Sequence, residues 1–429
     1  MKTQFANLSA VGVRALFWLG LLQMLPGCAA AKPLNYDIRC DCTVRDPEFA
    51  RVAGNLLGPS LVAGNSCTTL LNGSEIFPAI LDAIRSAKKT ITLETYIFWS
   101  GSIGREFTDA LSQRARAGVK VHVMLDAVGS SKIDQKYIKS MRNAGVQLTE
   151  YHPFHLWDPG TWRQLDNRTH RKLMIVDGKI GFTGGVGIAD EWRGHADSPK
   201  HWRDNHYRVE GPIVAQLQAA FEDNWVKTTG QVLAGDDYFP PLENTGNLWM
   251  QVFKSSTQGG SENMELMMLL SFSAARTHIR MESAYFIPDE NTRRYLLAAR
   301  ARGVRVEIIV PGSHIDEKVV RSASHAKWGQ LLKGGVEIYE YQPTMFHCKL
   351  LVVDDAWVSI GSSNLDNRSF QINDEANLNV LDSVFAAGQT KVFENDKANS
   401  KPMSYQRWKS RSLAERLSET LSSMFDGEL

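Results

Sequence analysis

Two stretches of this chain each place a histidine and a lysine two residues apart, at the start of an apolar run that ends in aspartate. The residues concerned are His170, Lys172 and Asp177 in THRKLMIVDGKIGFTGGVG, and His347, Lys349 and Asp354 in FHCKLLVVDDAWVSIGSSN. In an extended strand alternate side chains share a face, so each histidine points the same way as its lysine. One such pair is commonly a strand end that faces water, but two copies with identical spacing indicate a function.

Two imidazoles and two ammonium groups in one site would suit reactions of a phosphodiester. One neutral imidazole can attack phosphorus and form a phosphohistidine, while the other donates a proton to the leaving alkoxide. The second imidazole then takes a proton from the acceptor, which is an alcohol or water. The lysines would lie against the non-bridging oxygens and stabilise the charge of the transition state. This chemistry requires no metal ion and no other cofactor, so we expect neither.

Each histidine also needs a partner on its other ring nitrogen, because that partner fixes the tautomer. A carboxylate follows each stretch at the start of the next strand-like run: Asp204 in HWRDNHYRVEGP and Glu375 in NDEANLNV. We therefore expect Asp204 to orient the histidine of the first stretch and Glu375 that of the second. An ordinary salt bridge is the alternative for both carboxylates.

The aspartate of the first stretch has two possible roles. Asp177-Gly178 is a strong tight-turn dipeptide between KLMIV and KIGFTGG, so each stretch is predicted to form a hairpin. Asp177 is then either a turn former or a group that fixes the adjacent lysine or histidine.

The elements around the two stretches are repeated as well. Ile91–Tyr96 (ITLETY) and Ile279–Tyr285 (IRMESAY) are β-rich runs that carry the acidic residues Glu94 and Glu282. After each run come the end of a basic helix, a glycine and a buried strand, and then a second helix end, glycine and strand. The matching segments are RARAGVKVHVML with ARARGVRVEIIV, and NAGVQLTEYHP with KGGVEIYEYQP.

Strands that alternate with helices at this spacing predict an α/β fold. We expect two similar halves, each a mixed, mostly parallel sheet flanked by helices, packed about a pseudo-twofold axis with one shared active site. The expected parts are 1–31 as a signal, lipoprotein or membrane-anchor segment, 32–70 as an N-terminal segment with a cysteine cluster, 71–227 as the first half, 228–247 as a linker rich in Gly, Pro, Asp and Asn, and 248–429 as the second half with a C-terminal helical tail.

The first residues have the features of an export segment, because Lys2 and Arg14 precede the apolar stretch ALFWLGLLQMLPG. Leu25–Cys28 (LPGC) resembles a lipobox, in which cleavage leaves the cysteine to carry lipid, so Cys28 is a candidate lipid anchor. An uncleaved membrane anchor and a cleaved soluble form are the alternatives. All three predict export, and the first two predict a membrane-associated protein on the periplasmic side of a bacterium.

The cysteines fit an exported protein. An oxidising compartment would permit one disulfide among Cys40, Cys42 and Cys67, and the sequence leaves the pairing open. No second ligand pair follows Cys-x-Cys at zinc-site spacing, and His152 and His155 have no third ligand nearby, so no metal site is expected.

The composition is that of a globular protein, with 43% hydrophobic residues, 22% charged residues and a net charge of +1. No basic run resembles an arm that would neutralise a nucleic-acid backbone, so nucleic acid is not expected as a partner.

The duplicated pattern resembles the phospholipase D superfamily, and the resemblance extends over roughly residues 70 to 385. Within that superfamily, three segments are similar to bacterial cardiolipin synthases: Gly184–Trp192 (GGVGIADEW), Trp202–Val214 (WRDNHYRVEGPIV) and Gly361–Val380 (GSSNLDNRSFQINDEANLNV). Such enzymes move a phosphatidyl group from one phosphatidylglycerol to the hydroxyl of another and release glycerol. The resemblance thus implies phospholipid substrates and a membrane surface as partners. Phosphatidylethanolamine is a second candidate substrate, and the oligomeric state stays open.

The resemblance also implies roles for individual residues. The implied roles are nucleophile for His170, general acid and base for His347, phosphate ligands for Lys172 and Lys349, and polar phosphate contacts for Asn364 and Ser362. The first half departs from the family pattern, because Gly187 stands where these synthases usually have Asn and Gly185 where many superfamily members have Ser. We therefore expect a lopsided phosphate pocket, with side-chain donors mainly from the second half.

Three other functions are weighed against this one. A hydrolytic phospholipase D or phosphodiesterase would use the same phosphohistidine with water as acceptor. The near-zero net charge disfavours an exported nuclease, and the two complete His/Lys pairs disfavour a catalytically silent lipid-binding module.

Aromatic residues in Tyr151–Trp162 and in the Phe98-Trp99 pair are candidates for contact with the headgroup level of a bilayer, or alternatively pack on their own domain.

Overall fold

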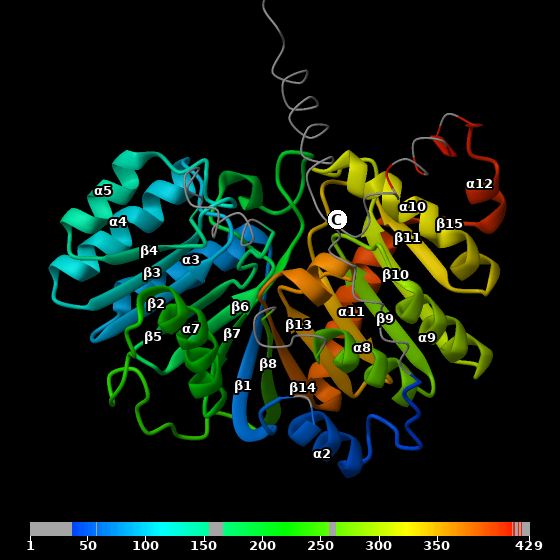
Figure 1. Ribbon diagram of the computed structural model, residues 1–429, viewed down its shortest axis with the longest axis horizontal. Coiled ribbons are helices and arrows are strands. Elements are labelled where there is room, and N and C mark those ends of the chain that lie inside the picture. Colours follow the sequence, from blue (N-terminus) through cyan, green and yellow to red (C-terminus); the bar gives the residue numbers. More distant parts are fainter. Residues whose placement is uncertain are drawn as a thin grey trace, which may run out of the picture. The chain divides into compact units, whose positions relative to one another are not determined.

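One mixed sheet of 15 strands runs through the part of the chain that the structure describes, which comprises residues 37–56, 58–153, 166–256, 263–413, 415–416, 419 and 422. The structure is a computed structural model (Figure 1). The strands up to the linker are β1 (Val62–Leu71), β2 (Thr90–Thr95), β3 (Lys120–Asp126), β4 (Gln147–Tyr151), β5 (Leu173–Val176), β6 (Ile180–Gly184) and β7 (Asn205–Glu210). Those after it are β8 (Leu248–Ser255), β9 (His278–Ser283), β10 (Arg305–Pro311), β11 (Glu337–Tyr341), β12 (Lys349–Val353), β13 (Trp357–Gly361), β14 (Glu375–Leu381) and β15 (Ser400–Met403).

The strand order reads the same outward from the middle in both directions. It is β15-β11-β10-β9-β12-β13-β14-β8-β1-β7-β6-β5-β2-β3-β4, so every strand of one half except β15 has a counterpart in the other. The central strands β1 and β8 pair antiparallel and join the halves into one sheet. This order confirms two similar halves related by a pseudo-twofold axis.

The pairing directions differ in part from the sequence-based expectation. Parallel pairs are confined to β2-β3-β4 and β9-β10-β11, where helical crossovers connect the strands. The sheet is therefore mixed, as predicted, but most of its pairs are antiparallel. The reason is that each histidine motif begins a hairpin, β5-β6 or β12-β13, and the strands that follow continue the antiparallel pattern.

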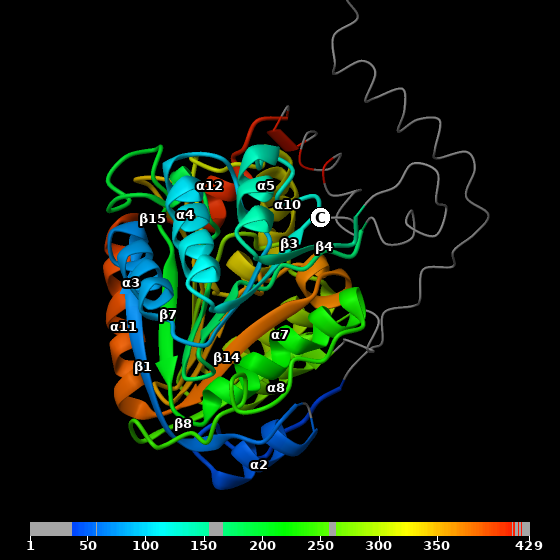
Figure 2. The same ribbon diagram turned by 90° about the vertical axis from the view of Figure 1, so that its left-hand side faces the viewer.

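Helices cover both faces of the sheet, and Figure 2 shows α3 and α11 on one side with α7 and α8 on the other. The helices are α2 (Pro47–Leu56), α3 (Asn72–Ser86), α4 (Ser102–Arg116), α5 (Gln135–Asn143), α7 (Ile213–Thr229), α8 (Asn263–Ala274), α9 (Glu290–Ala301), α10 (Lys318–Lys333), α11 (Ser383–Ala398) and α12 (Tyr405–Lys409), with a 3-10 turn η1 (Asp190–Trp192) and a π-helical turn η3 (Arg368–Ile372). Asp134, Asp289 and Asp382 cap α5, α9 and α11 by accepting backbone N–H bonds.

The hydrophobic core continues from one half into the other. Apolar side chains of α7, such as Phe221 and Trp225, belong to the same buried cluster as Phe393 of α11 and the inner faces of β8, β12 and β14. A second cluster lies between α3, α4 and strands β2 and β3 of the first half. Residues Ile38–Leu429 accordingly form one compact unit.

The strand β1 begins at Val62, nine residues before residue 71, where the first half was expected to begin. Its sequence, VAGNSCTTLL, lacks a clear apolar alternation, which is why the strand was not predicted. It pairs with β7 on one side and β8 on the other, so it is a central strand.

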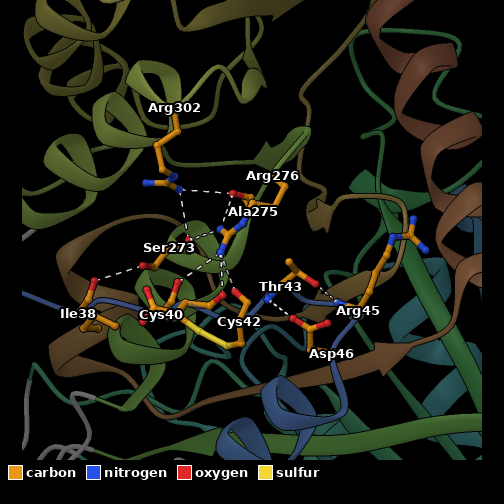
Figure 3. The surroundings of a disulfide bond; sticks show 11 residues. Ile38, Cys40, Cys42, Thr43, Arg45, Asp46, Ser273, Ala275, Arg276 and Arg302 are labelled. Atoms are coloured by element: carbon orange, nitrogen blue, oxygen red, sulfur yellow. Dashed lines mark hydrogen bonds between the residues drawn. A yellow bond between two sulfur atoms is a disulfide. The ribbon is translucent and has the colours of Figure 1, made fainter.

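Cys40 and Cys42 form a disulfide, which settles the pairing that the sequence left open (Figure 3). The Arg276 guanidinium donates hydrogen bonds to the backbone carbonyls of both cysteines and so ties this segment to the second half. Cys67 is a free thiol.

The expected export segment, 1–31, and the candidate anchor Cys28 lie outside the described residues. Within those residues, we find no helix that is long and apolar enough to cross a bilayer.

Candidate active site

Backbone bridges between the halves bring the two histidine motifs together. The His170 N–H donates to the Asp374 carbonyl at 2.9 Å, and the His347 N–H donates to the Arg203 carbonyl at 2.8 Å. Each bridge is a short parallel pairing between the residues ahead of a motif histidine and those ahead of the other half's carboxylate. The two motifs therefore face one another across the pseudo-twofold axis.

The carboxylates cross between the halves. His170 Nδ1 lies 2.9 Å from Glu375 Oε1, and His347 Nδ1 lies 2.7 Å from Asp204 Oδ2. Our expectation that each carboxylate orients the histidine of its own half is therefore wrong, because the backbone bridges place each carboxylate beside the opposite motif. Both carboxylates occupy the Nδ1 side of their rings, so neither of them blocks Nε2. Lys349 Nζ lies 3.2 Å from His347 Nε2.

The electrostatics of the two pairs follow from burial and from the paired charges. Burial lowers the pKa of both imidazoles, to about 4 for His170, and the neighbouring lysines lower it further. Burial alone would raise the pKa of Glu375 and Asp204, but the facing histidines hold both carboxyls below their usual range. Near neutral pH the site therefore contains two neutral imidazoles, each held by a carboxylate anion.

The two lysines are held in matching positions. Lys172 Nζ donates to the His170 carbonyl and Lys349 Nζ to the His347 carbonyl, each at 2.7 Å. Burial lowers the pKa of both ammonium groups, to about 7 for Lys172. A buried ammonium with a depressed pKa gains most from an anionic ligand, because the anion restores the charge that burial disfavours.

Anion binding should therefore weaken as the pH rises through the pKa of Lys172. The group is cationic below about pH 7 and neutral above it, so sulfate affinity should fall by up to about tenfold per pH unit on the alkaline side. Sulfate does not titrate in this range, and its inhibition constant can be measured from about pH 6 to about pH 9. In Lys172→Arg the guanidinium stays charged and the profile should flatten. An unchanged slope in that variant would assign the titration to another group.

A cavity of about 680 Å³ lies between the halves, and both motifs line it. His170, Lys172, His347 and Asn364 are among its walls, and Arg168 and Arg368 bring further positive charge. The Asn364 amide oxygen is buried and has no hydrogen-bond partner among the described residues. Asn364 lines the cavity, and any contact with a phosphate oxygen would come from its amide N–H groups, because phosphate oxygens accept hydrogen bonds.

Ser362 does not face the cavity. Its hydroxyl donates to Glu375 Oε2, and it accepts a hydrogen bond from the Ala376 N–H. The serine thus holds the carboxylate that orients His170, and the direct phosphate contact implied for it is not what the structure shows.

The motif aspartates lie at the far ends of their strands from the histidines. Asp177 accepts backbone N–H bonds from Lys88, Lys89 and Thr90, at 2.7 to 3.1 Å. Asp354 accepts equivalent bonds from Arg276, Thr277 and His278. Both aspartates have positive φ and sit in the hairpin turns. The turn role holds, and neither carboxylate reaches a catalytic histidine.

Replacing Asp177 should accordingly lower stability without changing the chemistry. Asp177→Gly tolerates the backbone φ of +53° but leaves three backbone N–H groups unpaired. We expect a loss of about 1–3 kcal/mol in the free energy of unfolding, measured with urea. Turnover per folded molecule should match that of Asp236→Gly, a control in an exposed turn. Normal stability with lost turnover would instead place Asp177 in the reaction.

Two tyrosines at the site were missed by the sequence analysis. The rings of Tyr96 and His170 contact edge to face with centroids 5.4 Å apart, and Tyr285 lies 6.5 Å from His347 in the same manner. Both tyrosines line the cavity. The repeat contained a signal for them, since ITLETY and IRMESAY each end in a tyrosine shortly after the acidic residue.

Those acidic residues, Glu94 and Glu282, are buried and do not line the cavity. Burial raises the pKa of Glu94 to about 7 and that of Glu282 well above its usual range. The oxygens of Glu282 lie close to Cys348 and Asp396, a trio whose atoms are of metal-ligating types. Arg203 donates two hydrogen bonds to Asp396, at 2.9 and 2.6 Å, so a cation already occupies this cluster.

Comparison with known proteins places this geometry in a family. The model of the family described as cardiolipin synthase, phospholipase D-like domain, matches residues 80–225 and 268–397. The chain belongs to the cardiolipin synthase family.

Curated relatives agree with this assignment, and a solved structure shares the fold. A probable cardiolipin synthase of Bacillus subtilis, YwiE, is 34% identical over 84% of this chain and 71% of the relative. Cardiolipin synthase A of Pseudomonas syringae is 36% identical over 78% of this chain and 68% of the relative. Phosphatidylserine synthase of Haemophilus influenzae shares the fold, with a TM-score of 0.68 at 14% identity over 88% of this chain and 97% of that chain.

The departures of this cardiolipin synthase family member from the family pattern have steric reasons. A Cβ atom at Gly185 would lie 2.2 Å from Asp204 Oδ1, so the carboxylate that orients His347 excludes a side chain there. A Cβ at Gly187 would lie 2.9 Å from Ile97 and 3.2 Å from the Trp192 ring. The first half therefore contributes no side-chain donor at these positions.

The aromatic candidates divide between core and cavity. Phe98 is fully buried in the first-half core, whereas Trp99 is half-buried and lines the cavity. Most of Tyr151–Trp162, including His155, lies outside the described residues.

Proposed function

We propose that the protein is a phosphatidyltransferase that forms cardiolipin from two molecules of phosphatidylglycerol through a phosphohistidine. The observation that carries the proposal is the pair of crossed histidine–carboxylate contacts on one cavity. Each imidazole is neutral and is held at Nδ1 by a carboxylate, and two buried lysines flank the pair, with Lys349 Nζ 3.2 Å from His347 Nε2. Family membership supports phospholipids as the substrates.

In the first step, His170 Nε2 attacks the phosphorus of the donor lipid. A P–N bond forms, the P–O bond to glycerol breaks, and His347 donates a proton to the leaving oxygen. Entry of the phosphodiester anion favours the imidazolium form of His347, and the Asp204 carboxylate 2.7 Å from Nδ1 stabilises it. Lys172 and Lys349 stabilise the charge on the non-bridging oxygens.

In the second step, His347 takes a proton from the hydroxyl of a second phosphatidylglycerol. The resulting oxygen attacks the phosphorus, the P–N bond breaks, and cardiolipin leaves with both phosphatidyl groups. Glycerol is the other product, so the atoms balance. No step requires a metal ion.

The test is to incubate detergent-purified protein with phosphatidylglycerol liposomes, with and without phosphatidylethanolamine, and to identify the products by mass spectrometry. We expect cardiolipin and glycerol from phosphatidylglycerol alone, undiminished by EDTA. Phosphatidic acid without cardiolipin would mean that water takes the phosphatidyl group and that the protein is a phospholipase. Activity lost in EDTA and restored by a divalent ion would overturn the metal-free mechanism.

We also propose that the protein is exported and works at a membrane, anchored through the segment 1–31. The wild-type protein should incorporate labelled fatty acid, whereas Cys28→Ser should not. Equal incorporation in both would remove Cys28 as the anchor.

A further inference from the structure

Two exposed valines lie at the mouth of the catalytic cavity. Val128 is 44% exposed and Val319 is 50% exposed, and both line the cavity. The other large apolar side chains exposed in the described part of the chain, such as Val232 and Val384, do not line it. Single exposed valines are ordinary on a protein surface, but two at the entrance of one cavity form a local apolar feature.

Each half contributes one of the two valines, from the segment that follows β3 or its counterpart β10. Val128 follows β3, and Val319 lies at the start of α10, just after the loop that follows β10. Because β3 and β10 are counterparts in the sheet, each half presents one valine to the shared entrance. Both halves therefore contribute apolar surface to the entrance, although at positions that do not fully correspond.

A tryptophan and a lysine accompany the valines. Trp99 and Lys132 line the same cavity, and the Lys132 ammonium lies 3.7 Å from the centre of the Trp99 ring. Trp and Lys are the side chains that favour the boundary between headgroups and water, where the ring is partly apolar and the ammonium meets lipid phosphates. Asp316 and Glu317 also lie at this entrance, and Tyr285 donates to Asp316 at 2.7 Å.

The size of the cavity limits what can enter it. A volume of about 680 Å³ is that of a site for a drug-sized molecule, and its inner wall carries charged and polar side chains. Two diacyl lipids with their chains are much larger than this. The headgroups can reach His170 and His347 while the acyl chains stay outside, so the surface at the entrance must meet the apolar part of the lipid.

We propose that Val128 and Val319, together with Trp99 and Lys132, form a docking rim that enters the interfacial layer of a phospholipid bilayer. This inference rests on the proposed function, because it takes phospholipids as the substrates. The rim would let a lipid pass headgroup first from the bilayer into the cavity without exposing its chains to water. Apolar contact should dominate, since Asp316 and Glu317 offset the charge of Lys132, so docking should persist in high salt.

The decisive measurement is the depth of the rim in a membrane. Val128→Cys and Val319→Cys, made in the full chain, are labelled with an environment-sensitive fluorophore and added to vesicles of phosphatidylcholine and phosphatidylglycerol. Val384→Cys is the matched control, because Val384 is 82% exposed and does not line the cavity. The unsubstituted chain, treated with the same reagent, gives the background from its natural cysteines.

We expect a blue shift and quenching by nitroxide-labelled lipids at positions 128 and 319, with neither at 384. Equal signals at all three positions, or a signal at 384 alone, would overturn the docking rim. This readout needs no turnover. Cardiolipin synthesis without quenching at 128 and 319 would therefore overturn the rim alone, whereas quenching without cardiolipin would overturn the proposed function alone.

A kinetic test is independent of the probes. Val128→Ser/Val319→Ser should raise the KM for phosphatidylglycerol in vesicles by about tenfold, because less apolar surface is buried on docking. The KM for a short-chain, monomeric phosphatidylglycerol should rise much less. The control Val232→Ser/Val384→Ser should match the wild type in both assays. Equal increases for vesicles and monomers would show that the valines act on the cavity rather than on docking.

Discussion

His170→Ala and His347→Ala are each expected to lower phosphatidyl transfer by about 10⁴-fold or more, with the fold intact. Both imidazoles lie on one cavity, and neither has a substitute among the described residues that line it. Turnover is measured with phosphatidylglycerol vesicles, and the fold is checked by thermal unfolding. His195→Ala, at an exposed position outside the cavity, is the control and should keep normal activity. Near-normal activity in either cavity variant would exclude a two-histidine mechanism.

The same two variants also assign the roles of the histidines. With donor lipid labelled in the phosphatidyl group, His347→Ala should form an acid-labile label on the chain slowly, because the acid of the first step is missing, and should then retain it, because the proton acceptor for the second step is missing as well. His170→Ala should carry none. The reverse pattern would make His347 the nucleophile.

The crossed carboxylates give the second large effect. Glu375→Gln and Asp204→Asn should each lower turnover by about 10²–10⁴-fold, because each amide fails to fix the tautomer of its imidazole or to stabilise its charge. The structure also predicts which step each one affects. Glu375 lies on His170, so Glu375→Gln should slow formation of the labelled protein, whereas Asp204→Asn should let it accumulate.

This assignment is the opposite of the one that chain order suggests. Had each carboxylate served the histidine of its own half, Asp204→Asn would deplete the labelled protein and Glu375→Gln would accumulate it. Glu394→Gln is a suitable control, since its side chain is 47% exposed and does not line the cavity. The experiment therefore distinguishes the two pairings by whether the labelled protein accumulates or is depleted in each variant.

The sequence predicted those parts of the site that depend on local spacing. The alternation in His-x-Lys placed each histidine and lysine on one face, and Asp177-Gly178 predicted the hairpin turn, which has positive φ at both residues. The repeat predicted two similar halves. These features follow from a few neighbouring residues, and they hold in the structure.

Features that depend on contacts between the halves could not be predicted in this way. The partner of His170 is set by the bond from its N–H to the Asp374 carbonyl, and no local pattern encodes that bond. Ser362 was expected to bind phosphate, but its hydroxyl donates a hydrogen bond to the carboxylate of Glu375 instead. The sequence also predicted too many parallel strand pairs. The turn at Asp177 makes β6 pair antiparallel with β5.

The crossed pairs also constrain how such a chain could arise by duplication. A single ancestral half would contain a histidine and a carboxylate that cannot meet within one copy, so its site would form only between two copies in an isologous dimer. In that dimer every substitution would appear twice. Fusion removes this restraint: Gly185 and Ser362 hold corresponding places beside the two orienting carboxylates, yet one excludes a side chain and the other supplies a hydrogen bond. One covalent chain can thus specialise its two histidines for different steps, which a symmetric pair of identical subunits cannot do.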